Sequence, residues 1–200
     1  MRCFPRAPGA LTASRMLRNT TYSAAYNHAM GTTVPYRGTD HTVRAMIDLA
    51  RGNRGEKSIK VRRHAEQIVG AVRPKDYASE AIAACRWWGN AGRYTRDPVH
   101  VEMLRDPERL IDDALAGKLA CDCDEFALAI GASCLVLGLP IQFVTVGFGP
   151  RLPGQPKIHT HVFVRAQDPR TKIWWVLDPV AGRRTGAMLA KVRQFSVFEV

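Results

Sequence analysis

Acidic side chains are absent from the first 39 residues of this 200-residue chain, where five arginines lie. Three prolines and the lack of an amphipathic period predict a basic flexible arm over residues 1–38, ahead of one domain over residues 39–200. The whole chain has 29 basic against 18 acidic side chains, so we expect weak, non-specific contacts of the arm with anionic surfaces. A stripe of Arg or Lys interleaved with aromatic residues is missing, which disfavours specific nucleic-acid recognition.

Three further features that the sequence lacks bear on location and cofactors. No apolar stretch of the signal-peptide kind opens the chain, so we expect no secretory signal. Residues 126–150 carry no charge, but Gly138-Leu139-Pro140 interrupts them, so we predict a buried helix, a turn and a strand, not a transmembrane segment. A phosphate-binding glycine loop is absent, and we expect no cofactor.

The cysteines exclude a secreted disulfide framework. They number five, and Cys121 and Cys123 are too close in sequence for a good local bridge. This pattern favours a reducing compartment and thiols that are buried or reactive.

Helical spacing of apolar residues dominates the first two thirds of the chain, and strand patterns follow. Asp40 and Asp106 are predicted N-caps, the latter with a proline at the first helical position. The order of these elements predicts an α+β fold. We expect helices over 40–51, 57–72, 76–89, from 106 to about 115 and from 123 to about 138, then strands over 141–148, 159–166 and 173–178.

Cys123 is placed where a helix begins. Asp122 is a suitable N-cap, and Glu125, three residues later, could complete a capping box. Lowering a thiol pKa by two units takes roughly 2.7 kcal/mol. A helix N-terminus supplies only about 0.3–2 kcal/mol, so a reactive Cys123 needs an imidazolium partner.

Two histidines on the next strand but one, and one carboxylate, can complete a catalytic set. The alternation of a strand would put His159 and His161 on one face, with either ring able to reach the thiol. Asp178 closes the adjoining strand and could orient the imidazole. A triad of Cys123, one of these two histidines and Asp178 is therefore spatially feasible.

A zinc site is the alternative use of the same region. Cys121, Cys123, His159 and His161 form a Cys-x-Cys and a His-x-His pair with tetrahedral potential. We favour the absence of a metal, because Asp178 would then have no role and a chain of this length can fold without one.

Three sequence blocks follow one another over roughly residues 80–180. The blocks are Cys123-Asp124-Glu125-Phe126-Ala127 with the helix leading into Leu137–Val144, His161-Val162-Phe163-Val164, and Trp175-Val176-Leu177-Asp178-Pro179. Their order and spacing resemble the transglutaminase-like cysteine-hydrolase superfamily. The resemblance implies a papain-like core, with N-terminal helices and a nucleophile helix packed on a small antiparallel sheet. It also implies a Cys123–His161–Asp178 triad, acting on an amide of a protein or peptide through a thioester, as hydrolase or acyl transferase.

Tyr94, Asp97-Pro98 and Phe-Val-Thr-Val-Gly at 143–147 are similar to short transglutaminase-like proteins of tailed phages and prophages. This similarity implies a phage or prophage origin, a place in the bacterial cytoplasm or the virion, and phage structural proteins as partners. A structural or interaction protein of the particle that keeps the fold without catalysis is the alternative. Arg165 departs from the pattern, since many relatives have an acid there.

An oxyanion donor is not evident from the sequence. The ring N–H of Trp87 or Trp88 is one candidate, although core packing is the more common role of such residues. The backbone N–H of Cys123 is the safer expectation.

Overall fold

The computed structural model describes residues 32–34, 38–97, 102–150, 159–181 and 190–200. Most of the predicted arm, residues 1–31 and 35–37, lies outside the described residues. Of its described part, Thr32–Val34 is a short strand, β1, paired antiparallel with β3 (Glu102–Leu104), and Gly38 precedes the first described helix.

Side-chain caps begin most of the helices, as the sequence patterns predict. Ser58 accepts the backbone N–H groups of Lys60 and Val61, and Asp106 accepts that of Arg109. The predicted N-cap at Asp40 is wrong, because α2 begins one residue earlier, after Gly38, and Asp40 lies in its first turn. The helices are α2 (Thr39–Arg51), α3 (Ile59–Val69), α4 (Tyr77–Ala91), α5 (Pro107–Leu115) and α6 (Cys123–Val136).

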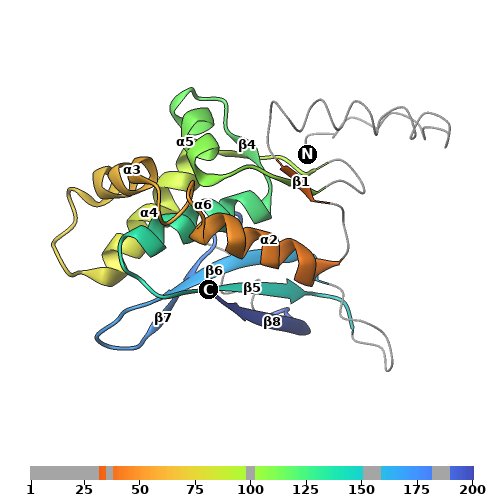
Figure 1. Ribbon diagram of the computed structural model, residues 1–200. Coiled ribbons are helices and arrows are strands. Elements are labelled where there is room, and N and C mark those ends of the chain that lie inside the picture. Colours follow the sequence, from red (N-terminus) through yellow and green to blue (C-terminus); the bar gives the residue numbers. More distant parts are fainter. Residues whose placement is uncertain (1–31, 35–37, 98–101, 151–158, 182–189) are drawn as a thin grey trace, which may run out of the picture.

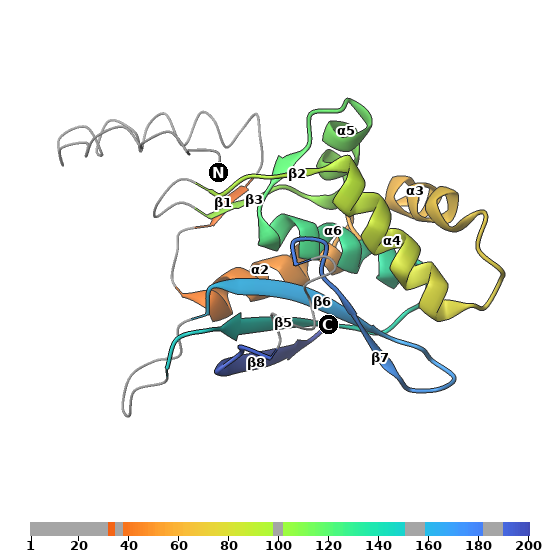
Figure 2. The same ribbon diagram turned by 180° about the vertical axis from the view of Figure 1, so that it is seen from behind.

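A four-stranded antiparallel sheet lies under the helices, so the fold is α+β (Figures 1 and 2). Its strands are ordered β7-β6-β5-β8, with bounds Trp174–Leu177, His161–Gln167, Ile141–Gly147 and Gln194–Glu199. Strand β8 was not expected from the sequence. It forms because β5 offers a second edge, and pairing with β8 satisfies backbone groups there.

Helix α6 is the centre of the core. It packs against β5 and β6, and the other four helices contact it (Figure 1). Gly131 permits the close approach to β5, since a Cβ there would lie 3.0 Å from Ile141 Cδ1 and 3.1 Å from Phe143 Cζ. Within the described part of the chain, no helix combines the length and apolarity needed to cross a bilayer. Burial of α6 on nearly all sides holds its first residue, Cys123, in a defined place.

A second, two-stranded pairing leads into α6. Strand β2 (Arg93–Tyr94) runs parallel to β4 (Ala120–Cys121), which ends one residue before the N-cap of α6. Backbone hydrogen bonds therefore join the segment that precedes Cys123 to β2, which follows directly after α4.

Candidate active site

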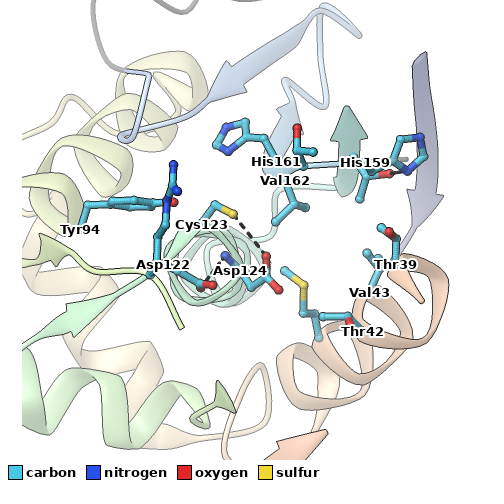
Figure 3. A pocket seen from close by; sticks show the side chains of 14 residues that line it. Thr39, Thr42, Val43, Tyr94, Asp122, Cys123, Asp124, His159, His161 and Val162 are labelled. Atoms are coloured by element: carbon cyan, nitrogen blue, oxygen red, sulfur yellow. Dashed lines mark hydrogen bonds between the residues drawn. The ribbon is translucent and has the colours of Figure 1, made fainter. Parts of the chain in front are cut away.

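A cavity of about 550 Å³ opens at the N-terminus of α6, between that helix, β6 and α2 (Figure 3). Cys123 and His161 both line it, and the remaining lining is a mixture of polar and apolar groups. The lining residues are Thr39, Thr42, Val43, Met46, Tyr94, Arg96, Asp122, Cys123, Asp124, Thr145, His159, Thr160, His161 and Val162.

The predicted start of a helix at Cys123 is confirmed. Asp122 is the N-cap, and its carboxylate accepts the backbone N–H groups of Asp124 and Glu125 at 3.0 and 3.4 Å. The predicted return contact of the capping box is wrong, because the Glu125 carboxylate instead accepts hydrogen bonds from Arg105. Burial, together with the charges of Asp97 and Glu125, raises the pKa of Asp122 to about 7.

The Cys123 thiol is half-buried and donates a hydrogen bond to Asp124 Oδ1, 3.4 Å away. Burial raises the pKa of Cys123 well above its usual range, and the charges of Asp124 and Asp122 raise it further. A backbone N–H of Val162 acts in the opposite direction. These contacts favour the protonated thiol, and only its deprotonated form would be a nucleophile.

His161 and Asp178 form a buried pair beside the thiol. His161 Nε2 lies 2.7 Å from Asp178 Oδ2, and the Asp178 side chain is only 1% exposed. The other carboxylate oxygen accepts the backbone N–H groups of Val180 and Ala181, each at 3.0 Å. These contacts favour the tautomer with its proton on Nε2, which leaves the lone pair of Nδ1 to accept a proton.

The thiol and the imidazole share the cavity without a hydrogen bond between them in the described structure. The sulfur is directed to Asp124 (Figure 3). His161 is hydrogen-bonded to Asp178 instead. The structure thus places His161 against Asp178 and brings Cys123 and His161 into the same cavity.

His159 occupies a different environment from His161. Its Nδ1 lies 2.9 Å from Thr145 Oγ1, and β6 begins only at His161. Both histidines line the cavity, but the strand alternation on which the prediction rests does not include His159, because β6 begins only at His161. Thr145 is opposite Val162 in the sheet register, on the side of the sheet that α6 covers.

The four residues of the alternative zinc site are not brought together. Cys121 is 3% exposed in β4 and does not line the cavity, and burial raises the pKa of its thiol above the usual range. Among described residues, the only three potential ligands with atoms within 4.8 Å of one another are Asp122, Cys123 and Asp124.

The two tryptophans pack in the core instead of lining the cavity. Trp88 is 1% exposed, and its ring N–H donates to Ser133 Oγ at 3.0 Å, so Trp88 has the core-packing role that the sequence favoured over that of an oxyanion donor. Trp87 packs edge-on against His64, with ring centroids 4.2 Å apart. Neither indole is among the cavity-lining residues.

Arg105 is a residue at this site that the sequence analysis missed. It is 7% exposed, and its guanidinium donates to Glu125 at 2.6 and 2.7 Å and to Asp113 at 2.8 Å. It also donates to the backbone oxygen of Ala120 at 2.6 Å. Arg105 thus holds the chain on both sides of Cys123. Its partners lie 8 to 20 residues away, so no local pattern could have revealed them.

Comparisons with known proteins add one similarity of fold. A scan against protein-family models found no match, and a search of curated proteins found none. Among solved structures, the chain is similar to a putative cysteine protease from Cytophaga hutchinsonii, with 19% identity and a TM-score of 0.48. The match covers 78% of this chain and 52% of that chain, so this chain spans about half the length of that protein. A likeness of this extent says nothing about activity, and the chemistry has to come from the cavity itself.

Proposed function

We propose that the chain is a cysteine-dependent amide hydrolase or acyl transferase of the transglutaminase-like type, acting on a protein or peptide. The observation that carries this proposal is the buried His161–Asp178 pair, 2.7 Å between Nε2 and Oδ2, in the same cavity as a cysteine at a helix N-terminus. This arrangement supplies a nucleophile, a base and a group that orients the base.

The chemistry would begin with a rotation of the Cys123 side chain away from Asp124. The thiol proton then passes to His161 Nδ1, and Asp178 stabilises the imidazolium that results. The sulfur attacks the amide carbonyl carbon, and the imidazolium returns its proton to the leaving amine. The thioester that remains on Cys123 is resolved by water or by a second amine.

Thiol reactivity and peptide cleavage together test this function. Iodoacetamide near pH 6, followed by mass spectrometry, should label Cys123 first, because among the described cysteines it is the one that lines the cavity together with His161. Asp178→Asn should slow both that labelling and the cleavage of a fluorogenic peptide library, the latter by roughly 10²–10⁴-fold. Cys121→Ala is the matched control and should change neither rate. Preferential labelling of Cys121, or labelling that is indifferent to Asp178→Asn, would contradict the triad.

A non-catalytic role in a phage particle is the second candidate. The hydrogen bond from the thiol to Asp124 and the raised pKa of Cys123 favour it, since both oppose the thiolate. Under this alternative Cys123 should react no faster than a free thiol, and Cys123→Ala should leave particle assembly unchanged. The phage or prophage origin, a virion location and phage structural partners stay predictions.

A further inference from the structure

The backbone of Tyr94 is fixed relative to the nucleophile. Tyr94 is opposite Cys121 in the parallel β2–β4 pair, and Cys121 precedes Cys123 by two residues. Hydrogen bonds of 2.9 Å on either side, from Arg93 N–H to Leu119 O and from Thr95 N–H to Cys121 O, hold the two segments together. The position of Tyr94 is therefore set by the same strand that leads into α6.

The side chain of Tyr94 enters the cavity. It lines the cavity together with Cys123 and Asp122, and Figure 3 shows its ring extending from β2 toward these two residues. It is 44% exposed, so a substrate can reach it. Arg96, also in the lining, hydrogen-bonds the phenol oxygen, which leaves the phenol O–H able to donate.

When a thiolate attacks an amide, the carbonyl oxygen gains a negative charge, and a hydrogen-bond donor such as the phenol O–H stabilises that charge. The Asp122 and Asp124 carboxylates in the lining would repel that charge. The backbone N–H groups of Asp124 and Glu125 are already donated to Asp122, and the ring N–H of Trp88 is donated to Ser133.

We propose that the Tyr94 hydroxyl, with the backbone N–H of Cys123, is the oxyanion donor of this site. As the carbon–sulfur bond forms, the π electron pair of the carbonyl moves onto oxygen, and the Tyr94 O–H donates a hydrogen bond to it. When the pair returns, the carbon–nitrogen bond breaks and the amine leaves with the proton from His161. The assignment rests on the proposed function.

Two reagents separate stabilisation of an oxyanion from activation of the thiol. p-Nitrophenyl acetate acylates Cys123 through a tetrahedral oxyanion, whereas iodoacetamide alkylates it at a saturated carbon without one. Tyr94→Phe should slow acylation by roughly 10–1000-fold, the range for loss of one oxyanion donor, and leave alkylation within about twofold of wild type. Unchanged alkylation also shows that the variant is folded.

Tyr77→Phe is the matched control, because Tyr77 lies in α4 with its ring under Arg170 and does not line the cavity. It should change neither rate. Equal acylation rates in wild type and Tyr94→Phe would overturn the role of Tyr94 alone. Equal losses in both reactions would also overturn it, since the residue would then act through the thiol. If Cys123 of the wild type were acylated no faster than free cysteine, the proposed function itself would fail, and this assignment with it.

Discussion

Replacing Arg105 with Met tests whether the buried ion pairs hold the nucleophile segment in place. The side chains of Arg105, Glu125 and Asp113 are 9%, 3% and 12% exposed. In Arg105→Met, Glu125 loses both hydrogen bonds to the guanidinium and the one cation that contacts it in the described structure. Asp113 keeps Arg109, 3.2 Å away, although the side chain of that arginine is 41% exposed.

The expected loss is dominated by Glu125. Removing one partner of a buried ion pair typically costs about 3–5 kcal/mol, because the other charge stays buried without compensation. Asp113 adds less, since its second partner remains. A loss of this size is a large part of the roughly 5–15 kcal/mol by which domains are usually stable.

Urea denaturation measures this loss, and two further variants show its origin. Arg105→Met combined with Glu125→Gln should recover about half of the lost free energy of unfolding or more, because a neutral amide is far less costly to bury than a carboxylate. Lys60→Met removes an exposed ion pair, with side chains 36% and 53% exposed, and should cost at most about 1 kcal/mol.

Two results would refute the reasoning about Arg105. One is a loss below about 1 kcal/mol in Arg105→Met, since breaking a buried pair costs several times more. The other is a double variant as unstable as the single one, which would show that the buried charge of Glu125 is not the cause.

Packing, burial and charge each lead to one more expected outcome. Gly89→Ala should lower peptide hydrolysis and stability, because the added Cβ would lie 2.8 Å from Pro179 Cβ, next to the triad carboxylate; Gly70→Ala, with contacts no closer than 3.5 Å, is the control. Burial lowers the pKa of His64 from 6.5 to about 4, so between these pH values the unfolded chain binds more protons than the folded chain. The urea midpoint should therefore decrease as the pH is lowered from 6.5 to 4, and His64→Phe should lack this contribution. Deleting residues 1–31 removes four arginines but leaves a basic chain, so it should leave the urea midpoint unchanged and lower the salt concentration that elutes the protein from an anionic resin. Unchanged hydrolysis in Gly89→Ala, the same pH dependence in His64→Phe, or unchanged elution of the truncated chain would contradict the respective prediction.

Local signals in the sequence determine where most elements begin. Asp122 and Asp106 are N-caps because a short polar side chain can accept the backbone N–H groups two or three residues ahead. Such contacts involve near neighbours, so the sequence alone predicts them. The strands of the β5–β6–β7 meander are predicted for the same reason, although β6 begins two residues later than expected and His159 falls outside it. The order of the cysteine, histidine and aspartate blocks along the chain also predicts which three residues the site brings to one region.

Tertiary structure alone decides the polar contacts between residues that lie far apart in the sequence. The sequence predicted that Glu125 would complete a capping box, but Arg105 lies within reach and a charged partner outcompetes a backbone N–H. Trp88 donates to Ser133, 45 residues away, so its N–H is lost to the cavity. The parallel β2–β4 pair places Tyr94 opposite Cys121, a position that no spacing along the chain indicates. Partners of this kind become neighbours only when α6 is buried, and burial makes every unpaired polar group costly; for that reason the packing of the whole domain, rather than any local pattern, selects them.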